Sequence, residues 1–445
     1  MKRILSFILL LSVLLPCAAQ FRDLPLDDSE TVRAFREHVT FLSAAMLEGR
    51  AAGSEGEAEA ARYVSAQLAA YDVELLSPRD GDPFGIARES GDTLRSRNVI
   101  GWVRGYDRKL SDRYIVVGAR LDNLGVNRLT IDGQPAEQIY YGANGNASGL
   151  AMMMELARMV RTNAVLFRRS VLFVAFGASS ETYAGAWYFL NRTFDAGKID
   201  AMINLDMVGA GQDGFCAYTS SNADLDQELQ ALTAELLPAV PKLTTTEPYP
   251  SDHRAFYALE IPSVFFSTGQ YPEHGTDRDT GGIIDYEGME RELETVYAFT
   301  KRIADTDRPP VFHADKVRRT AADDKAFAYY DCDQYPTFMG HSDPKFFLDR
   351  WVYQYLRYPQ AAVEQGIQGR VIVNFAVDTD GTVTDVEVSR GVHLLLDEEA
   401  LRVVKASPKW KPGKVKGRKV KAYISIPVEF KLEKKSKGTT IGIKK

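Results

Sequence analysis

The chain has 445 residues, which is longer than one typical domain, so we expect two folded units. Its 45% hydrophobic and 26% charged residues are ordinary for a folded globular protein and exclude a disordered or fibrous chain. The net charge of −6, without a basic stripe interleaved with aromatic residues, excludes nucleic acid as an expected partner.

The N-terminus predicts export. Lys2 and Arg3 are followed by an apolar run and then by small residues, the pattern of a secretory signal peptide over residues 1–19, cleaved after Ala19. The apolar run is too short to predict a stable membrane span. Lipidation at Cys17 and an uncleaved anchor are the alternatives. We therefore expect an exported protein of the periplasm, or one associated with the outer membrane.

Two cysteines remain after the signal peptide is removed. Cys216 and Cys332 could form a disulfide in an exported chain, or they could be two separate thiols. The surrounding sequence does not decide between these alternatives.

The first elements predicted along the chain are helices. Residues 29–71 have a helical pattern that is interrupted at residues 47–56, where "LEGRAAGSEG" is rich in glycine. Ser54 and Glu57 then have the spacing of a capping box at the start of the second helix.

Strands and helices alternate from there on. Apolar, β-branched runs bounded by glycine or aspartate predict strands, and longer periodic runs predict helices. The alternation predicts an α/β fold with a mixed, mostly parallel sheet and helices on both faces. Strands are expected at residues 98–105, 113–125, 201–209 and 261–269, helices at 146–162, 224–237 and 286–305, and a strand followed by a helix at 171–190.

Polar sequences follow most of these strands. Ligands of such sheets bind beyond the carboxyl ends of the strands, where the polar loops meet. We therefore expect a functional cleft formed by "GARLD", "GANGN", "GASSE", "NLDM" and "STGQYPEHGTDRDT".

A second, smaller α+β unit is predicted after a linker. Residues 305–332 combine two prolines with many charges, which is typical of a linker. We expect the second unit at residues 333–435 and a solvated lysine-rich tail at 436–445. Within this unit, Asp380-Gly381 predicts the turn of a hairpin. Its other expected elements are helical segments before residue 369, a helix at 396–407 and a last strand at 420–433.

Several segments of the first unit keep a common order and spacing: "LEGRAAGSEG…AARYV", "NVIGWVRG", "YIVVGARLDNLG", "GANGNASGLAMMMELAR", "RRSVLFVAFGASSETYAGAWYF", "INLDMVG", "SDHRAFYALEIPSVFFSTG" and "DRDTGGIIDYEGME". Together they resemble the di-zinc aminopeptidases, metallopeptidase family twenty-eight, over about residues 35–300. The resemblance implies a zinc-aminopeptidase fold for residues 20–304.

Enzymes of this family bind two zinc ions through histidines and carboxylates and use a glutamate as the general base. The resemblance implies which residues hold these positions here, and most of the family's residues are replaced. The first histidine corresponds to Arg120, the aspartate two residues later to Asp122, the bridging aspartate to Asn144, the general base to Ser179, the next glutamate to Ser180, the later aspartate ligand to Asp206 and the late histidine to Gly275.

These replacements predict a protein without a metal cofactor and without catalysis. Only Asp206 is retained as a ligand, and Arg120 can neither lose its proton nor coordinate a metal ion. A guanidinium in a ligand position also repels a cation. The alternative is an active aminopeptidase-like hydrolase with an altered metal site, for instance one zinc ion held by Asp206, His274 and Glu181.

Two further interpretations concern the neighbouring residues. If no metal binds, Glu181 faces solvent, His274 stabilises its loop, and His253 in the "SDH" motif is a hydrogen-bonded histidine. A hydrolase with Ser179 or Ser180 as the nucleophile is a different alternative, but these serines are not in a Gly-x-Ser-x-Gly elbow.

A salt bridge is predicted in place of the metal. We expect Arg120 to pair with Asp206, with Asp122 as a second candidate partner. The cleft would then persist as a polar site for a peptide, with Arg120 facing an anionic group such as a carboxylate.

The C-terminal unit contains "YLRYPQAAVEQGIQGRVIVNFAVDTDGTVTDVEVSRGV", "LDEEALRVVKASPKWKPGKVKGRKV" and "ISIPVEFKL". These segments resemble the carboxyl-terminal domain of TonB-type energy transducers over about residues 333–432. That domain binds peptide segments of outer-membrane transporters by strand addition, and Pro427 would suit an edge strand. We expect a module that binds an outer-membrane or periplasmic protein. A purely structural role and energy transduction from a retained anchor are the alternatives.

Overall fold

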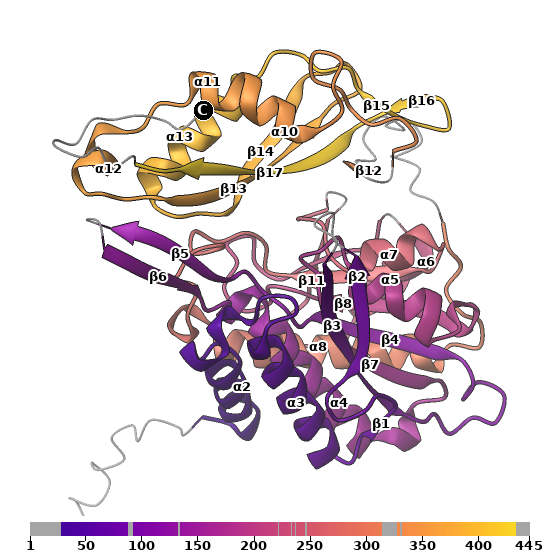
Figure 1. The fold of residues 1–445 in the computed structure, drawn as a ribbon. Helices are drawn as coiled ribbons and strands as arrows, with labels where there is room; N and C mark the ends of the chain where they lie inside the picture. Colours follow the sequence, from indigo (N-terminus) through magenta and orange to yellow (C-terminus); the bar gives the residue numbers. More distant parts are fainter. Residues whose placement is uncertain are drawn as a thin grey trace, which may run out of the picture.

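The computed structural model describes residues 28–87, 92–131, 134–220, 222–232, 234–235, 237–244, 247–313, 327–329 and 332–432. These residues form two units, which are coloured indigo to pink and orange to yellow in Figure 1. The predicted signal peptide, Cys17 and the lysine-rich tail lie outside the described residues. Among the residues described, no helix is both long and apolar enough to cross a bilayer.

The N-terminal unit is built on a nine-stranded sheet that consists of β1 (Glu74–Leu75), β2 (Asp82–Ala87), β3 (Thr93–Val103), β4 (Tyr114–Arg120), β7 (Ser170–Phe176), β8 (Ile199–Leu205), β9 (Cys216–Tyr218), β10 (Lys242–Thr244) and β11 (Ser263–Ser267). The strand order is β1-β3-β7-β4-β8-β11-β9-β10, and β2 pairs with β3. The central strands β7, β4, β8 and β11 run parallel, whereas β3 and β9 are antiparallel to their central neighbours. The sheet is therefore mixed, as predicted.

Helices cover both faces of this sheet. In β4, Ile115 and Val117 point into one core and Val116 points into the other, so the strand is buried on both sides. The predicted α/β architecture is confirmed. The first face is covered by α2 (Glu30–Leu42), α3 (Glu55–Ala70), α4 (Ser148–Thr162), α6 (Ala223–Leu232) and α8 (Tyr286–Asp305), and the second by α5 (Ala184–Tyr188) and α7 (His253–Ala258).

The start of α3 differs in one detail from the predicted capping box. The Ser54 hydroxyl accepts the backbone N–H of Glu57, as expected for an N-cap. The Glu57 carboxylate, however, accepts the N–H of Gly53 and also bonds the Ser96 hydroxyl and the N–H of Ala178. Glu57 therefore links the helix start to the loop that follows β7.

A hairpin that the sequence analysis did not predict projects towards the C-terminal unit. It consists of β5 (Gly125–Ile131) and β6 (Gln134–Tyr140), and Figure 1 shows it below β13 and α12 of that unit. The dipeptide Asp132-Gly133 between these strands is a hairpin signal that could have found it. The strand predicted at residues 113–125 ends earlier, at Arg120.

The C-terminal unit is a four-stranded sheet in the order β12-β17-β13-β14, with a separate small hairpin, β15–β16. The predicted turn at Asp380-Gly381 is confirmed, because Gly381 connects β13 to β14 with a φ of +88°. The bounds are β12 (Phe327–Ala328), β13 (Gly369–Val377), β14 (Val383–Arg390), β15 (Gly413–Val415), β16 (Arg418–Val420), β17 (Ala422–Phe430), α10 (Pro344–Phe347), α11 (Tyr353–Tyr355), α12 (Gln360–Glu364) and α13 (Leu394–Lys405).

The structure decides two further predictions, one about Pro427 and one about the two cysteines. Pro427 lies in the part of β17 that pairs only with β13 among the described strands, because β12 reaches only Ala422 and Tyr423; its edge position is confirmed. Cys216 and Cys332 are both buried and are not joined by a disulfide, so they are two separate thiols.

Candidate functional site

The residues of the predicted cleft lie together at the carboxyl ends of β4, β7 and β8. The last residue of β4 is Arg120, and the residue after β8 is Asp206. Arg120 Nη2 lies 3.2 Å from Asp206 Oδ1, and the two side chains are 19% and 3% exposed. The predicted salt bridge is therefore present. Burial lowers the pKa of Arg120, but the nearby carboxylates of Asp206 and Asp122 raise it more, so the guanidinium stays charged.

Asp122 is used by the turn after β7. Its carboxylate accepts the backbone N–H groups of Ser179 and Ser180 at 2.7 and 3.0 Å and the Ser180 hydroxyl at 2.6 Å. Glu57 accepts the preceding N–H, that of Ala178, at 3.2 Å. A turn with three inward N–H groups is a natural anion site, and here the chain's own carboxylates occupy it.

The Ser179 hydroxyl is bound to a residue that the sequence analysis did not single out. Its Oγ lies 2.8 and 2.9 Å from the two carboxylate oxygens of Asp252, which is fully buried. Burial and the charges of Asp206 and Asp122 raise the pKa of Asp252 to about 8, although the Ser179 bond lowers it. Asp252 is the middle residue of the "SDH" motif, where only the histidine was considered.

This bonding bears on the serine-nucleophile alternative. A serine nucleophile needs an adjacent base that is unprotonated at the working pH. Within the described part of the chain, the bonds of Ser179 and Ser180 lead to Asp252 and Asp122 and not to a histidine. Asp252 keeps its proton below a pH of about 8. Both hydroxyls thus serve as partners of buried carboxyl groups.

Asp206 is held from three sides. Besides Arg120, its carboxylate accepts the Ser251 hydroxyl at 2.8 Å, and Ser251 in turn accepts the Asn204 amide at 2.9 Å. Its backbone carbonyl accepts the Tyr249 hydroxyl at 2.6 Å. The retained ligand residue is therefore part of a hydrogen-bonded network.

Asn144 directs its side-chain oxygen into the fold. Its Oδ1 accepts the Gly209 N–H at 2.8 Å and the Ser148 hydroxyl at 2.9 Å, and its backbone N–H is accepted by Asp279. The buried amide nitrogen of Asn144 has no partner in the described structure, and neither has Nε of Arg120. Two buried N–H donors are thus left without an acceptor among the described residues.

The three neighbouring residues that were candidate metal ligands do not converge on one point. The Glu181 side chain is exposed, His253 Nε2 lies 2.9 Å from Glu247, and His274 Nδ1 lies 3.1 Å from Gln270. Burial and the charge of Arg120 lower the pKa of His274 to about 4. Over the described ranges, no three His, Cys, Asp or Glu side chains lie where they could hold a metal ion. The single-zinc set of Asp206, His274 and Glu181 is therefore not assembled.

A fully buried arginine positions two of the loops. Arg50 donates to the carbonyls of Leu121, Tyr141 and Gly142 at 3.2, 3.0 and 3.0 Å, and also to Leu42. The first three carbonyls belong to the loop after β4 and to the loop that leads into Asn144, and Leu42 is the last residue of α2. Arg50 lies in the quoted segment "LEGRAAGSEG", but a buried structural arginine has no sequence signature of its own.

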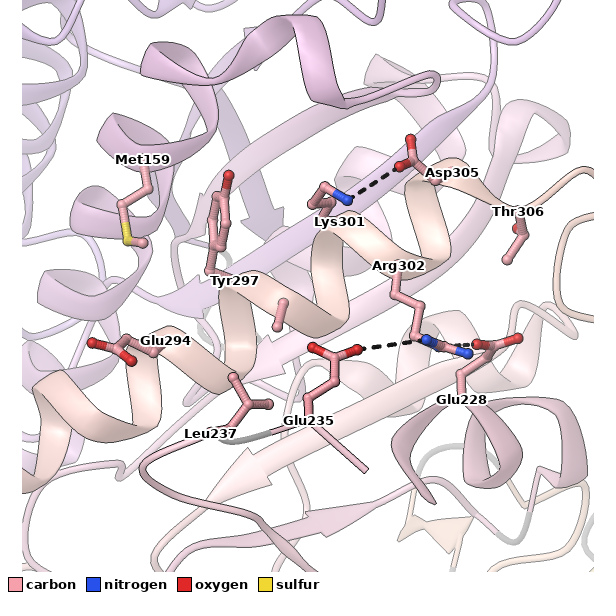
Figure 2. Close-up of a pocket in the computed structure, with 11 residues that line it drawn as sticks. Met159, Glu228, Glu235, Leu237, Glu294, Tyr297, Lys301, Arg302, Asp305 and Thr306 are labelled. Atoms are coloured by element: carbon pink, nitrogen blue, oxygen red, sulfur yellow. Dashed lines mark hydrogen bonds and ion pairs between the residues drawn. The ribbon is translucent and has the colours of Figure 1, made fainter. Parts of the chain in front are cut away.

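A cavity of about 640 Å³ lies elsewhere on the N-terminal unit, along α8 (Figure 2). Figure 2 shows Arg302 directed at Glu228 and Glu235, and Lys301 directed at Asp305. Asp305 accepts the N–H of Arg168, just before β7, so this cavity lies at the amino ends of the strands. Its two cationic side chains are paired with carboxylates of the same cavity, and it is not the predicted cleft.

Comparisons with known proteins agree with both resemblances. Residues 98–300 match the sequence model of peptidase family M28, and residues 354–432 match that of the Gram-negative bacterial TonB protein C-terminal domain. The chain is 24% identical over 194 residues to Aminopeptidase YwaD of Bacillus subtilis, covering 41% of this chain and 42% of that protein. It is 38% identical over 79 residues to Protein TonB of Xanthomonas campestris pv. campestris, covering 17% of this chain and 34% of that protein.

A solved structure supports the fold. BSAP, a zinc aminopeptidase from Bacillus subtilis, aligns with a TM-score of 0.50 at 15% identity, over 64% of this chain and 98% of that one. The chain spans less than half the length of the curated relatives it matches. It is an aminopeptidase-like protein with a TonB-like C-terminal unit.

Proposed function

We propose that this protein is an exported, periplasmic binding protein whose peptidase-like cleft holds a ligand without hydrolysing it. The observation that carries the proposal is the Arg120–Asp206 pair, which brings a permanent cation to the one retained ligand residue. An arginine there stabilises Asp206 by its own charge and leaves no need for a metal ion.

The residues of the cleft do not fit a pair of zinc ions. Two such ions carry four positive charges and need several carboxylates or imidazoles around them. Asp206 is paired with Arg120, and Asp122 accepts hydrogen bonds from Ser179 and Ser180. The side-chain oxygen of Asn144, which could coordinate a metal ion, accepts hydrogen bonds from Gly209 and Ser148 instead. The proposed function therefore uses no metal-dependent step.

The unpartnered donors suggest what the cleft binds. Buried N–H groups are nearly always hydrogen-bonded, so Arg120 Nε and Asn144 Nδ2 call for an acceptor from a ligand. A carboxylate, such as that of a peptide, is the acceptor that a guanidinium binds best. We therefore assign a carboxylate-bearing peptide as the ligand class.

The C-terminal unit would supply a second binding site, for an outer-membrane or periplasmic protein. Support comes from β17, which beyond Tyr423 has no second neighbour among the described strands. The Tyr353 hydroxyl already accepts the N–H of Glu429 at this edge, so a partner strand would have to displace it. Energy transduction would need a retained anchor, which mass spectrometry of the mature N-terminus tests.

The experiment that tests the loss of catalysis is a metal and activity measurement on the mature chain. We expect substoichiometric zinc by mass spectrometry after zinc loading and removal of free ions, and no release of p-nitroaniline from aminoacyl anilides. Stoichiometric zinc together with turnover that is lost in Asp206→Ala would establish the hydrolase alternative instead.

A separate titration tests the ligand class. Calorimetry with a peptide library should show binding of peptides with a free C-terminal carboxylate and loss of binding when that carboxylate is amidated. Arg120→Gln should abolish the difference between the two forms. Equal binding of free and amidated peptides would rule out the carboxylate contact.

A further inference from the structure

The C-terminal sheet has one apolar and one polar face. In β17, Ile424, Ile426 and Val428 are buried in the core of the unit, whereas Ser425 and Glu429 alternate with them and are exposed. Figure 1 shows α10, α11 and α13 on the far side of this sheet, with β13 and β17 on the side of the N-terminal unit. The polar face is thus turned towards the N-terminal unit.

This face touches the loops that form the cleft. A Cβ atom added to Gly275 would lie only 3.2 Å from the carbonyl oxygen of Ser389 in β14. The guanidinium of Arg254, two residues after Asp252, lies over the Tyr423 ring at 6.0 Å from its centre. At the late-histidine position, the chain therefore has a glycine, and a strand of the second unit takes up the adjoining space.

The β5–β6 hairpin fixes the second unit in this place. Leu129 of β5 is 8% exposed and belongs to the apolar core of the C-terminal unit together with Val392, and its Cβ would lie 3.5 Å from a Cβ added to Gly369. The hydroxyl of Tyr140 in β6 donates to the carbonyl of Gly391, directly after β14. An apolar anchor and a buried hydrogen bond thus hold β14 against the rim of the cleft.

From these contacts we infer that the C-terminal sheet is a cover of the cleft at Arg120 and that it controls which molecules enter. This inference deepens the proposed binding function and rests on it. Arg120 keeps 19% of its side-chain surface exposed beneath the cover, so water and a small group reach it. A bulky molecule reaches it only when the C-terminal unit moves away.

The interface between the two units leaves room for the C-terminal unit to move away from the cleft. Between the hairpin and the ends of β13 and β17 lies a groove of about 430 Å³, so the two surfaces are not closely packed there. The contacts named above are one leucine, one tyrosine hydroxyl, one cation–π pair and the approach of Gly275 to the Ser389 carbonyl. Relative motion of two units in one chain is the default expectation unless their interface is large and hydrophobic.

Cysteine labelling in the full chain tests the cover. The reporter is His274→Cys, next to Gly275, in a background with Cys216→Ala and Cys332→Ala. Its labelling rate is measured with N-ethylmaleimide and with a maleimide that carries a long polyethylene glycol chain, so that the two reagents share one reactive group and differ in size. We expect ready labelling by the small reagent, slow labelling by the bulky one, and a rise of about tenfold in the bulky rate when Leu129→Ser removes the anchor.

Controls separate opening from unfolding. Leu394→Ser changes an exposed leucine of the same unit (68% exposed) and should leave both rates unchanged. Tyr140→Phe removes only the hydroxyl and should raise the labelling rate with the bulky reagent to a smaller extent, with an unchanged circular dichroism spectrum of the native state. The inference of a cover would be refuted if both reagents labelled the His274→Cys reporter protein at equal rates. It would also be refuted if neither Leu129→Ser nor Tyr140→Phe raised the labelling rate with the bulky reagent.

The labelling uses no ligand. Its result therefore stands whether or not peptides bind at Arg120. If the cover is found but no peptide binds, only the proposed function is refuted. If peptides bind but the bulky reagent labels the reporter thiol freely, only the cover is refuted.

Discussion

Replacing Arg120 by methionine should destabilise the N-terminal unit strongly. The guanidinium and the Asp206 carboxylate are 3.2 Å apart and mostly buried. At an effective dielectric constant of about 20, their attraction is about 5 kcal/mol. Removing one partner of such a pair costs about 3–5 kcal/mol, and because the Ser251 hydroxyl still bonds Asp206, we expect the lower end of that range.

The assay is urea unfolding at pH 7, followed by circular dichroism, for Arg120→Met, Asp206→Asn and the double variant. The double variant should lose less than the sum of the single losses, by at least about 1 kcal/mol, because the two side chains interact directly. Arg128→Met is the matched control, since Arg128 and Glu137 form an exposed pair whose loss costs less than about 1 kcal/mol. A loss in Arg120→Met no larger than in this control would refute the reasoning.

Three further outcomes follow from the same structure. Ser179→Ala should lower the free energy of unfolding by about 1–3 kcal/mol, because it leaves the buried Asp252 without its hydroxyl partner; an unchanged urea midpoint would contradict this. Burial raises the pKa of Glu292 to about 8 from 4.5, so the folded state holds its proton more tightly and stability should fall by up to about 1.4 kcal/mol per pH unit between about pH 5 and 8. Glu292→Gln should flatten that slope in melts across this range, and an equally steep slope would exclude Glu292 as its source. Cys216 and Cys332 should both be alkylated after unfolding without reductant, whereas two unmodified cysteines in the mass spectrum would indicate a disulfide.

The main helices and strands were predictable because the apolar pattern of each segment matches the side chains that are buried in the fold. The apolar run of β7 is buried at every position, and α8 begins and ends at the predicted residues. The helix after β7 starts later than its sequence suggests, because Thr182 and Tyr183 adopt a positive φ and delay it to Ala184. Such a backbone path depends on the carboxylates that hold the turn, which are distant in the sequence.

The site was predictable in part. The Arg120–Asp206 pair followed from two residues that a family pattern places opposite each other. The roles of Asp252 and Glu57 did not follow, because each depends on a contact across more than 70 residues to the same turn, and a buried carboxyl group looks like an exposed one in the sequence. Which groups bond to one another within a buried polar network depends on the folded geometry and not on the local sequence.

The position of Leu129 also has a consequence for how the chain folds. The apolar core of the C-terminal unit includes this leucine from the β5–β6 hairpin, which is synthesised about 240 residues before β13. That core is completed only when two segments very distant in the chain have met, and contacts of this kind form slowly. During synthesis, the hairpin emerges long before its partner and presents an unpaired apolar side chain. Docking of one unit on the other therefore completes the apolar core of the C-terminal unit.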